Sequence, residues 1–362
     1  MGVLVIADDV LHRARQRVDD AEVLLTGRAA LLGLTSRGRI SAGGATQLLR
    51  ARDGWCALTL SRDDDIACVP ALLETDTAGE DPWPQLHRWA DGRNAEQVRD
   101  RARLLDLPVA VLGEADPGAP AVQRVGVPGT PGDPAGLLVV DLTSMWAGPL
   151  CAQLLARADA VVVKVESPRR PDGTRAGDRR FFDWMNGAKL GYAADFDRDR
   201  SALRAMLSAA DIVLEGSRPT ALTRRGLGPR DVPARPGRVW ARISGHGDDG
   251  DNSGRVAFGD DAAVAGGLVC RDETGPVFMG DALADPLTGI EAYVAVLDSL
   301  RRGGGELIEV SMAGVAAGYA VGATAQSAVS PRAPEILLPA PELGADNGAV
   351  DHLVSQRLGA TC

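Results

Sequence analysis

The chain of 362 residues carries 39 Lys and Arg against 49 Asp and Glu, a formal net charge of -10, and 45% of its residues are hydrophobic. This acidic balance, with scattered basic residues, argues against nucleic acid as a partner. The lack of an apolar run of about 18 residues argues against a membrane span. Five cysteines without C-x-x-C spacing indicate neither a disulfide framework nor a metal site. With no signal-peptide pattern at the start, we expect reduced thiols in a cytoplasmic protein.

The N-terminal part, residues 1–113, predicts a mixture of helices and strands. A helical stretch is expected near residues 9–34 and a second helix at 95–105, with strands at 55–60 and 107–112. The following segment, residues 114–136, is dense in Pro and Gly and predicts a linker.

The C-terminal part, residues 137–362, has a more regular pattern. Apolar runs typical of buried strands occur at 137–142, 160–166, 211–216, 238–244 and 307–312, with helical stretches between several of them. Strands that alternate with helices indicate a parallel sheet covered on both faces. The predicted fold class is α/β, with a large Rossmann-like domain and a smaller α+β domain.

The sequence lacks the motifs of several common binding and catalytic sites. Glu166 ends the second strand, where a dinucleotide-binding enzyme places its ribose-binding acid, but the first turn, TSMWAGPLC, lacks G-x-G-x-x-G. The glycine run at 303–306 predicts a turn rather than a phosphate cradle. No H-E-x-x-H or G-x-S-x-G motif occurs, and His246 is expected to be an exposed loop residue.

Asp285, in the stretch GDALADPLTGIEAY, has two interpretations. Followed by Pro286 and an apolar helical stretch, it fits the cap of a helix. It also fits a nucleophile, since the amino end of a helix stabilises a negative charge and an ionised carboxylate can attack a thioester. The earlier Asp281 is expected to be structural.

Six segments in chain order resemble the class III CoA-transferases, the family of formyl-CoA transferase, carnitine CoA-transferase and the 2-methylacyl-CoA racemases. The first segment contains a strand, an A-G-P turn, a helix and a second strand that ends in an acidic residue. The six read VVDLTSMWAGPLCAQLLARADAVVVKVESP, NGAKLGYAADF, DIVLEGSRPTALTRRGLG, ISGHG, GDALADPLTGIEA and GGGELIEVSM. The resemblance implies that Asp285 is the covalent nucleophile. It also implies that the chain moves CoA from an acyl-CoA to a carboxylic acid through an aspartyl-CoA thioester. CoA thioester is then a substrate rather than a tightly bound cofactor, and a homodimer is expected.

The resemblance also assigns residues to the CoA site and to a glycine-rich loop. Gly43 and Gly44 match the family's loop that closes over the aspartyl intermediate, although a plain turn would explain them too. For each basic residue of the CoA site, a solvated surface charge is the alternative. The CoA site would comprise Ala147, Gly148, Pro149, Lys164, Arg175, Lys189 and Arg218.

The order of the domains departs from the family. Residues 39–60 and 91–112 resemble the small domain that usually follows the large one, so 1–113 is interpreted as a small domain moved to the front. Residues 137–362 would be the large catalytic domain.

Two alternative functions stay open. In an acyl-CoA racemase a histidine would be needed where Phe258 and Gly259 stand, and a non-catalytic acyl-CoA-binding subunit would need no nucleophile.

Overall fold

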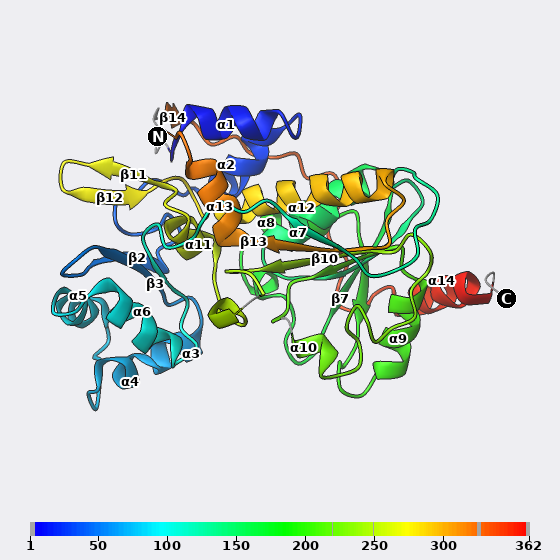
Figure 1. The fold of residues 1–362 in the computed structure, drawn as a ribbon, viewed down its shortest axis with the longest axis horizontal. Coiled ribbons are helices and arrows are strands. Elements are labelled where there is room, and N and C mark those ends of the chain that lie inside the picture. Colours follow the sequence, from blue (N-terminus) through cyan, green and yellow to red (C-terminus); the bar gives the residue numbers. More distant parts are fainter. Residues whose placement is uncertain (1–3, 219, 249, 324–326, 360–362) are drawn as a thin grey trace. The chain divides into compact units, whose positions relative to one another are not determined.

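The computed structural model describes residues 4–218, 220–248, 250–323 and 327–359. The chain forms two compact units, each assembled from three segments. The first unit comprises residues 1–119, 245–287 and 311–333, and the second comprises 120–244, 288–310 and 334–362. Figure 1 labels the elements of both units.

The first unit begins with a strand and two helices and continues with a helix-covered sheet. Its N-terminal segment holds β1 (Leu4–Ile6), α1 (Asp8–Arg15), α2 (Ala21–Leu32), β2 (Thr46–Arg50), β3 (Trp55–Thr59), α3 (Asp63–Ala67), α4 (Val69–Leu73), α5 (Trp83–Asp91), α6 (Ala95–Arg103) and β4 (Val109–Val111). Its later segments hold η2 (Gly250–Asn252), α11 (Gly259–Ala265), β11 (Val269–Asp272), β12 (Gly275–Phe278), α13 (Met312–Ala320) and β14 (Ser327–Val329).

The antiparallel sheet β2–β3–β4 is buried on both faces. Successive side chains of a strand point to opposite faces, so Leu48 and Ala57 lie on one side and Leu49 and Cys56 on the other. The Leu49 face packs on α4, α5 and α6, and the Leu48 face packs on Val264 of α11. Helices α3 to α6 lie together beside this sheet in Figure 1. The two-sided burial explains the consecutive apolar residues at 48–49 and 56–58, while Gln47 and Arg50 of β2 stay partly or fully exposed.

The second unit is built on a seven-stranded sheet in the order β5-β13-β10-β9-β6-β7-β8. Its elements are β5 (Ala121–Arg124), β6 (Leu138–Leu142), α7 (Ala147–Arg157), β7 (Val161–Glu166), η1 (Gly173–Ala176), α8 (Arg179–Asn186), β8 (Leu190–Ala193), α9 (Arg200–Ala209), β9 (Ile212–Glu215), α10 (Thr220–Thr223), β10 (Val239–Ser244), β13 (Glu306–Ser311) and α14 (Asn347–Gly359). Helix α12 (Ala284–Arg301) begins in the first unit and continues in the second.

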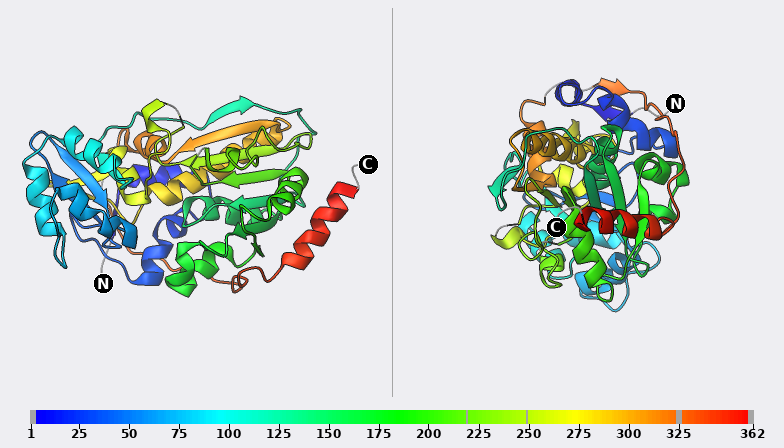
Figure 2. Two further views of the ribbon diagram at one scale, coloured as in Figure 1. Left: turned by 90° about the horizontal axis from the view of Figure 1, so that it is seen from below. Right: turned by 90° about the vertical axis from the view of Figure 1, so that its right-hand side faces the viewer.

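Strands β10, β9, β6, β7 and β8 run parallel, and β5 pairs antiparallel with β13 at one edge. The left view of Figure 2 shows β5 (teal), β13 (orange) and β10 (yellow-green) side by side. One core of this unit joins Leu138, Val163 and Val213 of the sheet to Leu203 of α9 and Val350 of α14. The predicted α/β class with a large, mostly parallel sheet is confirmed.

The expected strands lie within one residue or two of the observed ones, but other parts of the sequence behave differently. The helical stretch at 9–34 is two helices, α1 and α2, separated by residues 16–20, four of which are polar. The expected linker contains β5, so part of it belongs to the large sheet. Glycines 303–305 form a turn, as expected, and Glu306 begins β13. Gly304 has a φ of +62°, and a Cβ atom there would lie 2.0 Å from the carbonyl oxygen of Gly237.

The division into domains at 1–113 and 137–362 stays a prediction, because the compact units group the chain differently. In the described residues, Cys56, Cys68, Cys151 and Cys270 are free thiols, while Cys362 lies outside the described residues. No helix in the described ranges has both the length and the apolar character that a membrane crossing requires.

Candidate active site

Asp285 lies in the first turn of α12, next to its first residue. The helix begins at Ala284, so Asp285 is inside the helix rather than at the cap position that the sequence predicts. Its side chain is partly buried, while the residues on either side are buried. The first turn of a helix presents unpaired N–H groups and the positive end of the helix dipole, which stabilise a carboxylate there.

The backbone of Gly259, the first residue of α11, lies against the Asp285 carboxylate. A Cβ atom on Gly259 would lie 2.3 Å from Asp285 Oδ2 and 2.4 Å from the carbonyl oxygen of Ala282. The next residue, Asp260, accepts a hydrogen bond from the N–H of Ala282 at 3.0 Å. The two halves of the segment 259–285 therefore meet at the start of α12.

A buried ion pair connects α2 to this site. Arg28 Nη1 lies 2.5 Å from Asp281 Oδ1, and the Asp281 side chain is fully buried. The same guanidinium faces the predicted glycine loop, since a Cβ atom on Gly43 would lie 3.6 Å from Arg28 Nη2. Ser41, at the start of this loop, hydrogen-bonds the Asp260 carboxylate. The structure thus brings Asp285 and the Gly43–Gly44 loop to one cluster within the first unit.

Three further carboxyl groups of this cluster have altered acidity. Burial and the nearby Asp281 charge raise the pKa of Asp260 to about 6. Burial raises the pKa of Asp261 to about 7, although hydrogen bonds from the Phe258 N–H and the Thr59 hydroxyl oppose the shift. Burial also raises the pKa of Asp281, against the opposing charge of Arg28. Carboxyl groups with raised pKa values in a polar cluster are typical of functional sites.

The residues expected to bind CoA belong to the second unit. Two of them are buried inside ion pairs: Lys164 Nζ lies 2.9 Å from Asp172 Oδ2, and Lys189 Nζ lies 2.8 Å from Asp141 Oδ2. The side chains of Lys189 and Asp141 are both fully buried. Burial lowers the pKa of Lys189 to about 8, with the Asp141 charge opposing the shift. For Lys164, burial also favours the neutral amine, but Asp141 and Asp172 outweigh it and raise the pKa.

The other expected CoA contacts differ in exposure. Arg175 pairs with Glu166 at 2.7 Å and donates to the carbonyl of Pro341, whereas Arg218 is exposed. The residues Ala147, Gly148 and Pro149 form the first turn of α7 and are buried. The preceding Met145 has a φ of +73°, an unusual conformation for a residue with a side chain. Backbone strain of this kind at the end of a central strand is frequent in ligand sites.

Three residues of the site were not found from the sequence. Arg28 and Asp260 were assigned no role, and Asp281 was expected to be structural. Their contacts join positions far apart in the chain, with 253 residues separating Arg28 from Asp281. The one local signal is the pair of adjacent acids, Asp260 and Asp261, in the first turn of the otherwise apolar helix α11.

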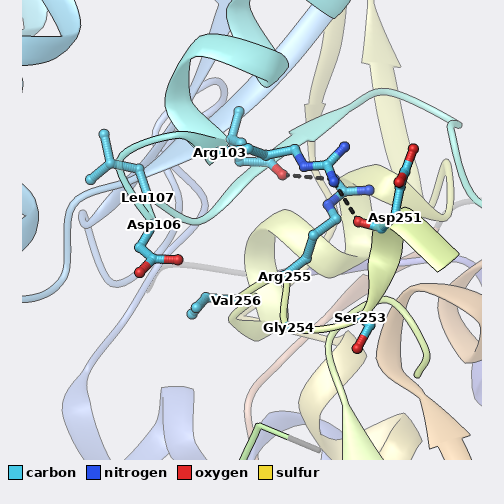
Figure 3. Close-up of a pocket in the computed structure, with 9 residues that line it drawn as sticks. Arg103, Asp106, Leu107, Asp251, Ser253, Gly254, Arg255 and Val256 are labelled. Carbon is cyan, nitrogen blue, oxygen red and sulfur yellow. Dashed lines mark hydrogen bonds between the residues drawn. The ribbon is translucent and has the colours of Figure 1, made fainter. Parts of the chain in front are cut away.

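A separate pocket of about 140 Å³ lies in the first unit beside the loop that carries Arg255 (Figure 3). Its two arginines are held by protein acceptors: Arg103 donates to the carbonyl of Asp251, and Arg255 pairs with Glu114 at 2.5 Å. Nearby His246 is buried, so the expectation of an exposed histidine is wrong. Burial and the charges of Arg255 and Arg103 lower its pKa to about 3, which leaves it neutral at pH 7. None of the predicted site residues lines this pocket.

Among the residues that the structure covers, no group of three or more His, Cys, Asp or Glu side chains is arranged to hold a metal ion. The cluster at Asp285 consists of acidic side chains, the Arg28 guanidinium and the backbone of Gly259. Together they offer an accessible carboxylate at a helix amino end, which is the group needed to attack an acyl carbon.

Comparison with known proteins identifies the family of the chain. Residues 135–347 match the family described as CoA-transferase family III. The chain belongs to this family. An acyl-CoA transferase of Fusarium pseudograminearum is 30% identical over 203 residues, which cover 49% of this chain and 44% of the relative. A succinyl-CoA–D-citramalate CoA-transferase of Chloroflexus aurantiacus is 30% identical over 193 residues, 48% of each chain.

The chain spans about half the length of the curated relatives it matches. Among solved structures, a CaiB/BaiF family protein from Brucella suis is 27% identical, with a TM-score of 0.48, over 52% of this chain and 55% of that one.

Proposed function

We propose that this family member is a CoA-transferase that moves CoA from an acyl-CoA thioester to a carboxylic acid, with Asp285 as the covalent nucleophile. The observation that carries the proposal is the placement of Asp285. Its carboxylate lies in the first turn of an 18-residue helix, against the backbone of Gly259 and in the same cluster as the Gly43–Gly44 loop. Family membership supplies the reaction class, and the geometry supplies a suitable nucleophile.

The reaction would proceed through two anhydrides and one thioester. A carboxylate oxygen of Asp285 attacks the thioester carbon of the donor, and the C–S bond breaks to release CoA thiolate. The thiolate then attacks the aspartyl carbonyl carbon, releasing the donor acid as a carboxylate and leaving an aspartyl-CoA thioester. The acceptor carboxylate attacks this thioester, CoA thiolate leaves again, and its attack on the acceptor's acyl carbon restores the Asp285 carboxylate. No proton is gained or lost over the cycle.

The surroundings of Asp285 suit this sequence. The amino end of the helix stabilises the ionised Asp285 carboxylate that attacks. Negative charge develops near this same carboxyl group in each later step, where the helix end stabilises it again. Phe258 and Gly259, which stand where the racemases of the family have a histidine, carry no titratable group, and the acid that follows them, Asp260, does not replace that histidine. A racemase needs a second proton carrier at this place, so transfer is favoured over proton exchange at the carbon next to the thioester.

The test is mass spectrometry of the intact protein after brief incubation with a panel of acyl-CoAs. We expect wild type to gain an adduct of CoA mass that hydroxylamine removes. Asp285→Ala should gain none. Asp272→Ala, which removes an exposed acid of the same unit, should behave as wild type. Absence of any adduct on wild type, with acyl-CoA binding intact, would overturn the covalent mechanism and favour the acyl-CoA-binding alternative.

The quaternary structure and domain order belong to the same proposal. The family match begins at residue 135, which supports the interpretation that the large catalytic domain follows a small one at 1–113. We propose that the protein works as a homodimer, in the cytoplasm, on acyl-CoA and carboxylic acid substrates. Light scattering on the purified chain measures the dimer directly, since a mass near twice 37.8 kDa is expected.

A further inference from the structure

We propose that Gly259 and Asp260 are positioning residues, which together hold the Ala282 turn and thereby fix where the Asp285 carboxylate lies. The inference rests on the proposed function of Asp285 and adds the part of the chain that orients it. It arises from contacts between the first turn of α11 and the turn that leads into α12, which are more than 20 residues apart in the sequence.

The first observation is the lack of space at Gly259. An added Cβ atom would come within 2.3 Å of Asp285 Oδ2 and 2.4 Å of the Ala282 carbonyl oxygen. Contacts under 3.0 Å do not occur between real Cβ atoms and their neighbours, so one partner would have to move. Gly259 does not have a positive φ, which means that its requirement for glycine is one of space and not of backbone conformation.

The second observation is the way the Ala282 turn is held. Its N–H donates to Asp260 Oδ1 at 3.0 Å, and its carbonyl accepts from the Asp285 N–H at 2.9 Å. Ala282 has a φ of +45°, which costs on the order of 1–2 kcal/mol for a residue with a Cβ atom. Such a conformation persists only where the surroundings hold it, and here Asp260 and Gly259 supply the contacts.

The third observation connects this arrangement to the rest of the site. Asp260 itself is held by Ser41, which stands next to the Gly43–Gly44 loop, and the Ala282 turn follows Asp281, which Arg28 anchors. The turn that precedes Asp285 is therefore held by hydrogen bonds with the side chains of Asp260 and Arg28, while the backbone of Gly259 lies against the Asp285 carboxylate. A nucleophile must lie about 3 Å from the carbon it attacks, and a misplacement of about 1 Å can slow a reaction ~10²-fold.

The experiment compares four variants with wild type. Gly259→Ala is expected to slow formation of the CoA adduct ~10²-fold while acyl-CoA affinity changes less than threefold. Asp260→Ala removes the hydrogen bond to Ala282 and should slow it about tenfold. Asp260→Asn keeps an acceptor oxygen and should stay within about threefold of wild type. Gly318→Ala is the matched control, because a Cβ atom there meets nothing within 4 Å.

A second readout does not depend on CoA chemistry. Carboxyl groups are labelled with a carbodiimide and an amine, and the label on Asp285 is measured by peptide mass spectrometry against exposed Asp272. A change of threefold or more at Asp285 alone, in Gly259→Ala and Asp260→Ala but not in Gly318→Ala, supports the inference. Should wild type form no adduct while this labelling change occurs, the proposed function fails and the positioning role stands.

Unchanged labelling and an unchanged adduct rate in both Gly259→Ala and Asp260→Ala would overturn the inference. If Gly259→Ala does not fold, the comparison of Asp260→Ala with Asp260→Asn decides. Rescue by asparagine supports positioning through the hydrogen bond, and equal behaviour of the two variants contradicts it.

Discussion

Replacing Lys189 by methionine tests whether this residue binds CoA or stabilises the fold. Its ammonium lies 2.8 Å from Asp141 Oδ2, and both side chains are fully buried. At an effective dielectric constant of about 20, two unit charges at this distance attract by about 6 kcal/mol before solvation costs. The variant leaves the buried Asp141 carboxylate without the ammonium of Lys189. The N–H and hydroxyl of Thr143 still donate hydrogen bonds to it.

Removing one partner of a buried pair typically costs about 3–5 kcal/mol. Since Thr143 and Lys164 still stabilise Asp141, we expect Lys189→Met to lower the free energy of unfolding by about 3 kcal/mol. The double variant with Asp141→Asn removes the unpaired charge and should recover at least about 1 kcal/mol. Urea denaturation followed by circular dichroism measures both, and calorimetric titration with CoA measures binding.

The exposed Arg224, which is not among the predicted CoA contacts, provides the matched control, since Arg224→Met should leave the free energy of unfolding and CoA affinity unchanged. A loss of CoA affinity in Lys189→Met with less than about 1 kcal/mol of lost stability would refute the structural role. It would mean that Lys189 leaves Asp141 to meet a phosphate of CoA.

Three further predictions concern the cluster and the glycine turn. Asp261 has a folded-state pKa of about 7 against an ordinary 3.8, so the folded protein binds an extra proton between these values and loses stability as the pH rises through them. The free energy of unfolding of Asp261→Asn should therefore rise relative to that of wild type by up to about 4 kcal/mol between about pH 4 and pH 8. Urea titrations measure it, and a difference that stays constant with pH would contradict this. Arg28→Ala leaves Asp281 buried without its cation and should cost about 3 kcal/mol by the same measurement at about pH 7; a loss below about 1 kcal/mol would show that the pair is unimportant. Gly304→Ala, with its positive φ and a backbone oxygen 2.0 Å from the new Cβ atom, should lower the melting temperature by several degrees, and an unchanged melting curve would contradict the tight packing of this turn.

The parts of the fold that the sequence predicted are those with a strong local signal. Strands β6 and β7 are continuous apolar runs, because both faces of a parallel sheet are covered. Strand β5 was missed because all four of its side chains are exposed and it lies among Pro and Gly residues. Its formation depends on pairing with β13, which no pattern within four residues can indicate.

In the candidate site, too, the sequence pointed only to residues that have a local signal. Asp285 was singled out because a short motif that resembles the family's surrounds it, and Gly43 and Gly44 because they match the family's glycine-rich loop; these assignments stay predictions. Arg28 could not be found, since its role depends on a partner 253 residues away. Lys164 did have a local signal: a lysine within the apolar run VVVKVE points to a buried amine that needs a carboxylate, and that carboxylate is Asp172.

Strand β5 also determines how the protein tolerates cleavage. It covers the outer backbone groups of β13, whose Leu307, Ile308 and Val310 are buried. If a protease cut on both sides of residues 121–124, loss of this peptide would leave the six-residue strand β13 at the sheet edge with unpaired N–H and C=O groups. Such an edge recruits strands from other chains. Limited proteolysis in the Pro- and Gly-rich segment should therefore yield aggregates rather than two separately soluble fragments.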